Sequence, residues 1–169
     1  MKVILYMATS VNGLIAKNDD SSDFITEVES QSYAKKVLKA GALIVGKRTY
    51  GVLSKQSEFQ EFLKAGVKIV AVSHKNFEVN PNHFVARSPK EALEILKDFK
   101  EVIVAGGSML NVSFITENLV DEIYLDIEPI ILGKGIPLFK EKDFERNLKL
   151  LGQKKISDNE IQLHYEVLK

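Results

Sequence analysis

The chain has 169 residues, of which 45% are hydrophobic and 27% are charged, a balance typical of a globular domain with a substantial core. Its 23 basic and 23 acidic side chains cancel, so net charge gives no reason to expect nucleic acid or an anionic membrane as a partner. The absence of cysteine excludes thiol catalysis, disulfides and thiolate metal sites. We expect one domain over residues 1–169.

The first apolar run, residues 2–8, leads directly into polar Thr9 and Ser10, so it is too short for a signal peptide. No apolar stretch approaches the ~18 residues that a membrane span needs. These features predict a cytoplasmic protein without a membrane partner.

Strand-like runs follow one another along the whole chain, and helix-like segments separate the first five of them. The predicted strands are residues 2–8, 42–46, 67–73, 83–86, 101–105, 122–128, about 148–155 and 160–168. Predicted helices cover residues 29–40, a segment that starts at Ser88-Pro89 with a cap and a proline in the first turn, and residues 109–116.

This order of elements predicts an α/β fold, a central mostly parallel sheet with helices on both faces. The last two runs alternate polar and apolar residues and are joined by Ser157-Asp158-Asn159, which favours a C-terminal antiparallel hairpin.

Two strands end in a glycine at the start of a predicted helix, where free backbone N–H groups and the helix dipole attract phosphate. The first such end, Gly46-Lys47-Arg48-Thr49-Tyr50, adds two cations and a hydroxyl, which suits the extra monoester phosphate of NADPH. A neighbouring strand end would add Ser73, His74 and Lys75 to the same phosphate. An ordinary helix cap at a basic strand end is the simpler alternative.

The second such end is Gly106-Gly107, after the apolar residues 102–105 and before the predicted helix that begins near Met109. A diglycine lets the main chain approach a pyrophosphate closely, although a tight strand-to-helix turn explains it equally well. It is not the three-glycine fingerprint of Rossmann domains.

These motifs, in this order, resemble the dihydrofolate reductase-like superfamily, which includes dihydrofolate reductases and the pyrimidine reductases of riboflavin synthesis. Residues 8–16, with Asn12-Gly13 between apolar positions, resemble the first strand and mobile loop, although a simple hairpin would have the same pattern. Residues 46–50, 72–73 and 106–107 resemble the phosphate-binding segments, and the Gly106–Gly107 peptide of the family is typically cis. Residues 119–129 and 132–139 resemble the riboflavin-type branch in particular.

The resemblance implies a dihydrofolate reductase-like fold that binds NADPH across the carboxyl ends of its strands and passes hydride to a C=N bond. The expected cofactor contacts are Ala8, Ile15, Gly46, Lys47, Arg48, Thr49, Ser73, His74, Gly106, Gly107, Ser108 and Met109. Met7, Tyr33 and Asp126 are expected to contact the substrate.

The expected catalytic acid is Glu29, because dihydrofolate reductases carry a buried carboxylate on the first helix, four residues before an aromatic residue. Glu29 precedes Tyr33 by four residues, so both lie on one helix face. Glu27 is the nearest rival, and a solvated acid at a helix start is the simpler alternative.

Two departures from the family's pattern leave the identity of the substrate undecided between its branches. Val67 stands where dihydrofolate reductases have an arginine for the substrate's glutamate tail, and Lys64 or Lys68 could bind that carboxylate only as a point charge. Leu14 stands where riboflavin-type reductases tend to have a lysine.

We expect reduction of a pteridine or related pyrimidine, with 7,8-dihydrofolate as the leading substrate. The alternatives are reduction of 5-amino-6-(5-phosphoribosylamino)uracil and a noncatalytic nucleotide-binding module. No residue cluster has metal-ligand spacing. A homodimer is compatible with the sequence.

Overall fold

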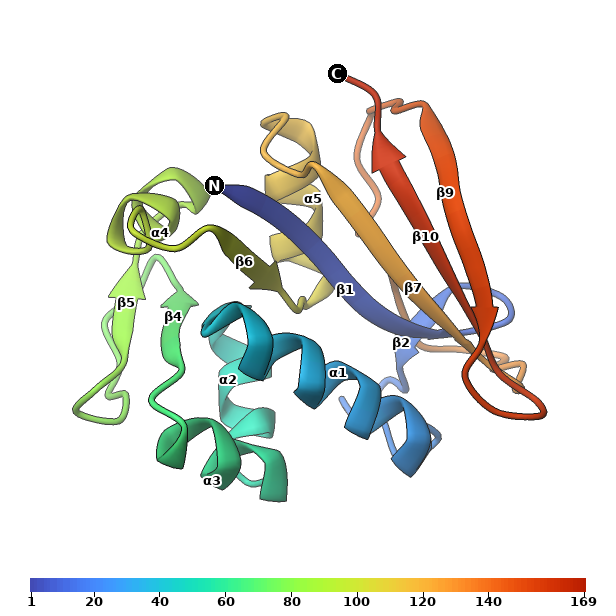
Figure 1. Ribbon diagram of the computed structural model, residues 1–169, viewed down its shortest axis with the longest axis horizontal. Coiled ribbons are helices and arrows are strands. Elements are labelled where there is room, and N and C mark those ends of the chain that lie inside the picture. Colours follow the sequence, from blue (N-terminus) through green and yellow to red (C-terminus); the bar gives the residue numbers. More distant parts are fainter.

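The computed structural model describes residues 1–169 as one eight-stranded sheet between two layers of helices (Figure 1). The strands are β1 (Lys2–Ser10), β3 (Ala42–Gly46), β4 (Lys68–Val72), β5 (Phe84–Ala86), β6 (Glu101–Val104), β7 (Glu122–Glu128), β9 (Leu148–Lys155) and β10 (Ile161–Val167). Their order across the sheet is β5-β4-β3-β6-β1-β7-β10-β9. Within this sheet only the β7–β10 and β10–β9 pairs are antiparallel, so the predicted mostly parallel sheet and C-terminal hairpin are confirmed.

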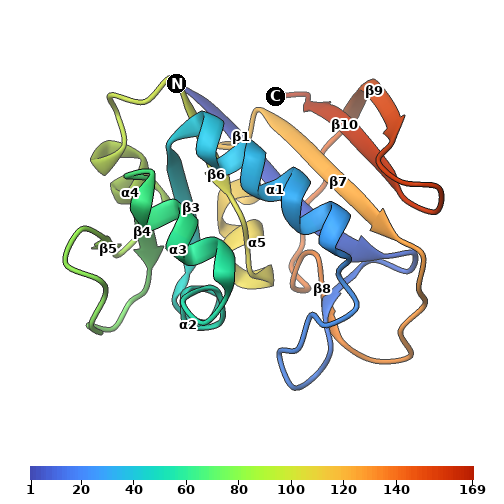
Figure 2. The same ribbon diagram turned by 60° about the horizontal axis from the view of Figure 1, so that its bottom comes forward.

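The helices are α1 (Glu27–Ala40), α2 (Lys47–Leu53), α3 (Ser57–Lys64), α4 (Pro89–Ile95) and α5 (Ser108–Thr116). Figure 2 shows α1, α2 and α3 grouped on one face of the sheet. None of the helices is long and apolar enough to cross a membrane.

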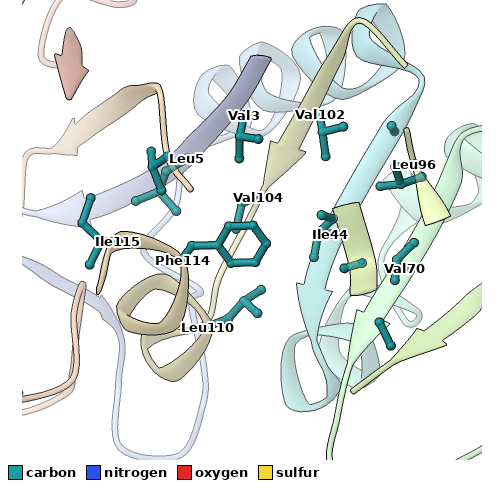
Figure 3. Packing of buried hydrophobic residues seen from close by; sticks show 14 of the residues in the cluster. Val3, Leu5, Ile44, Val70, Leu96, Val102, Val104, Leu110, Phe114 and Ile115 are labelled. Atoms are coloured by element: carbon teal, nitrogen blue, oxygen red, sulfur yellow. The ribbon is translucent and has the colours of Figure 1, made fainter. Parts of the chain in front are cut away.

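Successive residues of the central strands point to opposite faces, and both faces are buried. Val3, Leu5 and Ile44 join the core under α4 and α5, where Phe114 is fully buried (Figure 3). Ile4 and Leu43 belong to the second core, with residues of α1, α2 and α3. This continuous burial explains why the strands read as unbroken apolar runs in the sequence.

Helix α1 begins two residues earlier than predicted because Thr26 caps it. The Thr26 hydroxyl accepts a hydrogen bond of 3.2 Å from the backbone N–H of Glu29. The pattern Thr-x-x-Glu at residues 26–29 is a recognised helix-start signal that the sequence prediction did not use.

The loop after β1 is not a simple hairpin. Strand β2 (Leu14–Ala16) pairs with β8 (Ile136–Pro137) in a separate two-stranded sheet, rather than with β1. The Asn12 side chain fixes this arrangement, since its Nδ2 donates to the Leu132 carbonyl at 2.7 Å and its Oδ1 accepts from the Leu132 N–H at 3.1 Å. Residues 10–16 are therefore tied to the segment around residues 132–137.

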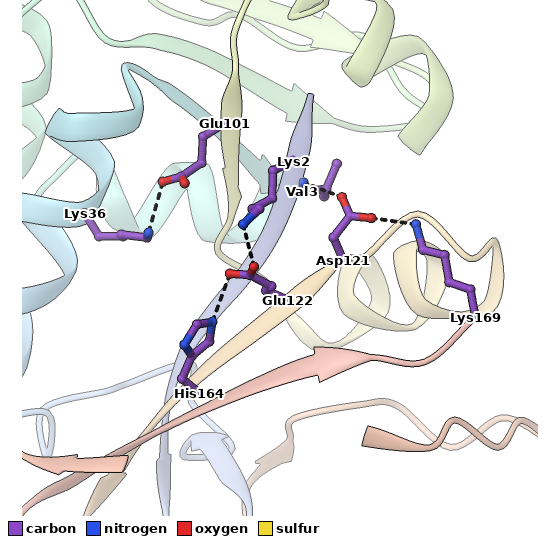
Figure 4. Close-up of polar contacts among 8 residues, drawn as sticks. All are labelled: Lys2, Val3, Lys36, Glu101, Asp121, Glu122, His164 and Lys169. Atoms are coloured by element: carbon purple, nitrogen blue, oxygen red, sulfur yellow. Dashed lines mark hydrogen bonds and ion pairs between the residues drawn. The ribbon is translucent and has the colours of Figure 1, made fainter. Parts of the chain in front are cut away.

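Charged groups join the strands at the edge of the sheet where β1 begins (Figure 4). Lys2 Nζ lies 2.6 Å from Glu122 Oε1, and His164 Nε2 lies 2.9 Å from Glu122 Oε2. The Asp121 carboxylate accepts a bond of 2.8 Å from the Val3 backbone N–H and pairs with Lys169 at 2.6 Å. His164 thus joins the terminal hairpin to β7.

Candidate active site

A cleft of about 860 Å³ lies at the carboxyl ends of the parallel strands, between α1, α2 and α5. Because β1, β3, β4 and β6 run parallel, their carboxyl ends meet at one edge of the sheet, where ligands of open α/β sheets bind. The volume is at the upper end of the range for small-molecule sites.

Nearly all of the predicted cofactor contacts line this cleft. They are Ala8, Ile15, Gly46, Lys47, Arg48, Thr49, Ser73, His74, Gly107, Ser108 and Met109. Gly106 does not line it; its φ is 78°, and its carbonyl accepts a 2.7 Å hydrogen bond from Gly46 N. The Gly106–Gly107 peptide is cis, as the resemblance implied.

The starts of α2 and α5 lie against each other at this edge. A Cβ built on Gly107 would lie 3.3 Å from Thr49 Oγ1, so the two helix starts approach as closely as a glycine allows. No side chain caps α5, so its first backbone N–H groups are free for a ligand. The Ser108 hydroxyl beside them is buried and makes no hydrogen bond.

The basic groups at this edge differ in how freely they could reach a ligand. Arg48 is exposed and pairs with Asp20 at 3.3 Å. Lys47 Nζ lies 5.1 Å from the centre of the Phe77 ring. The Ser73 hydroxyl is held in a local turn, where it accepts from Lys75 N at 3.1 Å and lies 2.8 Å from Lys75 O.

Glu29 lies in the cleft and is only 4% exposed, whereas Glu27 is exposed outside it. Burial raises the pKa of Glu29 to about 8, and the nearby carboxylates of Asp126, Glu128 and Glu160 add to the rise. A carboxyl group with this pKa holds its proton at neutral pH, which suits a general acid.

Tyr33 and Met7 also line the cleft, but Asp126 does not. Asp126 is 1% exposed, and its Oδ2 accepts a hydrogen bond of 2.7 Å from the Tyr6 hydroxyl, while Tyr6 itself lines the cleft. Asp126 therefore lies outside the cleft lining, in contrast to the expected direct substrate contact, and is joined to the cleft through Tyr6. Strand β7 pairs with β1 in a register that sets Asp126 beside Ala8, so its side chain lies on the same face of the sheet as that of Tyr6, two residues before Ala8.

Two further buried acids escaped the sequence prediction. Glu128 is 1% exposed, and its Oε1 accepts from the Thr26 backbone N–H at 3.3 Å. Glu160 accepts a hydrogen bond from the Thr26 hydroxyl. Glu128 follows Asp126 by two residues and so faces the same side of β7, a period-two signal that could have revealed it. Both acids hold the start of α1, and thus Glu29, in place.

The two lysines considered as partners of a substrate carboxylate, Lys64 and Lys68, do not line the cleft. Lys68 Nζ donates to the Ile95 carbonyl at 2.9 Å and lies over the Phe84 ring, so it is committed to the packing of α4 and β5. The structure thus gives neither lysine a place beside a substrate bound in this cleft.

The fold and this cleft define a protein of the dihydrofolate reductase-like class. Residues 1–162 match the family model for the RibD C-terminal domain, and the chain belongs to that family. It is 30% identical to the uncharacterized protein YwjB of Bacillus subtilis (strain 168), over 97% of each chain.

Solved structures show the same fold. A protein assigned to riboflavin biosynthesis in Shewanella sp. PV-4 superposes with a TM-score of 0.80 and 23% identity, over 100% of both chains. The diaminohydroxyphosphoribosylaminopyrimidine deaminase/5-amino-6-(5-phosphoribosylamino)uracil reductase of Thermotoga maritima superposes with a TM-score of 0.73 and 21% identity, over 99% of this chain and 56% of that one.

Proposed function

We propose that this protein is an NADPH-dependent reductase that acts on a C=N bond of a pyrimidine-type substrate. The observation that carries the proposal is that one cleft holds both a buried carboxylic acid, Glu29, and an edge built for phosphate groups. The family assignment favours the pyrimidine alternative over dihydrofolate, which was the leading expectation. A solvent-facing Glu29 and the absence of an apolar cleft would favour the noncatalytic alternative, whereas Glu29 is buried and lines the cleft, which supports a catalytic role.

The residues at the phosphate edge fit the cofactor. The free N–H groups at the start of α5 and the unpartnered Ser108 hydroxyl suit a pyrophosphate, and the exposed Arg48 and His74 suit the extra phosphate. When bound, NADPH supplies a hydride, which carries two electrons to the carbon of the C=N bond.

Glu29 supplies the other half of the reduction. In the proposed reaction its protonated carboxyl gives a proton to the nitrogen of the C=N bond, directly or through one water, so that the product is a CH–NH group. The carboxylate left behind takes a new proton from solvent. Tyr6, whose hydroxyl is fixed by Asp126, and Tyr33 line the same cleft as Glu29, and in the proposed reaction their rings would exclude water from the reacting bond.

The test is a two-part measurement on the purified protein. Calorimetry with NADPH and NADH measures cofactor binding, for which we expect tighter binding of NADPH. Loss of NADPH absorbance is then followed with 5-amino-6-(5-phosphoribosylamino)uracil, its unphosphorylated ribosylamino counterpart, 7,8-dihydrofolate and a 7,8-dihydropterin without a side-chain carboxylate. Absence of NADPH binding, or of oxidation with all four compounds, would overturn the proposal.

A further inference from the structure

An ion pair joins two segments that line the cleft. Arg48 Nη1, in the first turn of α2, lies 3.3 Å from Asp20 Oδ1, in the loop of residues 17–25 between β2 and α1. Both residues line the cleft. No other ion pair or side-chain hydrogen bond connects this loop to α2. Asp20 thus occupies the side chain that we propose as a partner of the extra cofactor phosphate.

The loop holds Asp20 through contacts of its own. The Asp20 backbone N–H donates to the Lys17 carbonyl at 3.1 Å, and the Lys17 N–H donates to the Ser21 carbonyl at 2.8 Å. Lys17 Nζ also pairs with Asp23 at 2.6 Å. Asp20 has a φ of 67°, in the left-handed region, which aspartate and asparagine adopt more readily than most residues. The turn therefore fixes the Asp20 backbone independently of the ion pair.

The Asp20 carboxylate and a cofactor phosphate would compete for one guanidinium group. The Arg48 side chain is 76% exposed and that of Asp20 is 34% exposed, so water screens their attraction. Exposed pairs of this kind favour contact by only about two- to fivefold. A phosphate monoester carries up to about two negative charges and can accept two parallel N–H bonds from arginine, so it is the stronger partner. With the phosphate bound, an unmoved Asp20 would add a further negative charge against the same cation.

We infer that Asp20 is a specificity-determining residue that competes with the extra phosphate of NADPH for Arg48. This inference rests on the proposed reductase function and goes beyond it, because it names a contact of the free protein that must break when this cofactor binds. NADH has no such phosphate, so it leaves the Asp20–Arg48 pair intact. Asp20 thus lowers the affinity for NADPH and reduces the preference for NADPH over NADH.

Calorimetry with NADPH and NADH measures the effect of removing the competing charge. Asp20→Asn keeps the size of the side chain and suits the left-handed backbone, so this variant should fold as the wild type does. We expect it to bind NADPH about two- to fivefold more tightly than the wild type does, and NADH equally well.

Asp19→Asn is the matched control. Asp19 is the exposed neighbour of Asp20 in the same loop and lies outside the cleft lining. Its Oδ1 accepts a 3.0 Å bond from the Ser21 N–H, which the asparagine oxygen can also accept. The control removes one negative charge and should leave both affinities unchanged at an ionic strength of about 0.15 M, which screens long-range charge effects.

A double-mutant cycle separates competition for Arg48 from direct repulsion of the phosphate. In competition, Asp20→Asn gains affinity for NADPH only while Arg48 is present, so the gain should vanish in an Arg48→Ala background. Direct repulsion between Asp20 and the phosphate would give the same gain in both backgrounds and would overturn the inference.

The outcomes also separate this inference from the proposed function. If the wild type binds NADPH but Asp20→Asn binds it equally well or more weakly, or if Asp19→Asn gains as much affinity, the inference is overturned while the reductase function stands. If the wild type binds neither cofactor, the function and the inference fall together.

Discussion

The hydroxyl of Tyr6, on β1, lies 2.7 Å from Asp126 Oδ2, on the adjacent strand β7. Gln162 Nε2 donates to the same hydroxyl at 3.0 Å, and Asp126 Oδ1 has no hydrogen-bond partner. Tyr6→Phe would leave a buried carboxylate without its donor, so we expect the free energy of unfolding to fall by about 1–3 kcal/mol. Tyr165→Phe on β10 is the control, since the Tyr165 hydroxyl makes no hydrogen bond. If urea denaturation showed that both variants lose the same free energy of unfolding, the stabilising role of the Tyr6–Asp126 hydrogen bond would be contradicted.

The buried acids should make the protein less stable at alkaline pH. Burial raises the pKa of Glu29 to about 8 and that of Glu128 to about 7, while an unfolded glutamate titrates near ~4.3. Between these values the folded chain holds protons that the unfolded chain has released. The free energy of unfolding therefore falls as pH rises from about 4 to about 8.

Glu29→Gln tests the contribution of one of these acids. The variant has no charge to bury, so at pH 9 it should be more stable than the wild type by about 2–4 kcal/mol, with little difference at pH 4. Urea denaturation of both proteins from pH 4 to pH 9 measures this difference in the free energy of unfolding. Stability curves that run parallel for the two proteins would show that Glu29 is not the group responsible.

The same residue should control the pH dependence of catalysis. With Glu29 as the acid, kcat/KM should be level up to about pH 8 and then fall about tenfold per pH unit. Glu29→Gln should lower the rate at neutral pH by about 10²–10⁴ and leave NADPH affinity nearly unchanged. Glu27→Gln, exposed on the same helix, serves as the control and should behave as wild type.

Arg48 should distinguish the two nicotinamide cofactors. Its side chain is 76% exposed, so we expect Arg48→Ala to weaken NADPH binding by about 1–2 kcal/mol and NADH binding by much less. Lys39→Ala, on the exposed surface of α1, is the control for loss of one positive charge. If calorimetry found equal losses for both cofactors, the extra phosphate would have to bind elsewhere.

The close approach of Gly135 to β2 can be tested with a matched glycine pair. A Cβ on Gly135 would overlap the Ala16 carbonyl oxygen, a backbone atom that cannot move aside without breaking the β2–β8 pairing. Gly135→Ala should therefore lower the free energy of unfolding by about 1–3 kcal/mol. Gly133→Ala, where a Cβ would meet nothing within 4 Å, should have little effect. A thermal melt that ranked the two variants equally would argue against this packing.

The sequence by itself determined most of the strands and helices and the sheet edge at which we propose that phosphate binds. Strand and helix periods are local patterns, so the apolar runs at residues 42–46 and 101–105 predicted β3 and β6 to within a residue. Glycines at the ends of parallel strands must gather at one edge of the sheet, which is why Gly46 and Gly107 lie together. Glu29 and Tyr33 lie on one helix face because they are four residues apart, which is also a local property of the sequence.

Only the tertiary structure decided which charges are buried and which lie together. Asp126 and Glu29 are both acids with suitable local spacing, yet one is enclosed behind Tyr6 and the other faces the cleft, because strand register and helix docking fix their directions. The sequence leaves Lys68 free to bind a carboxylate, but in the structure its ammonium group donates to the Ile95 carbonyl at the end of α4. The cleft depends on residues of α1, α2 and α5 lining the same space, and contacts between segments so far apart in the chain leave no local pattern in the sequence.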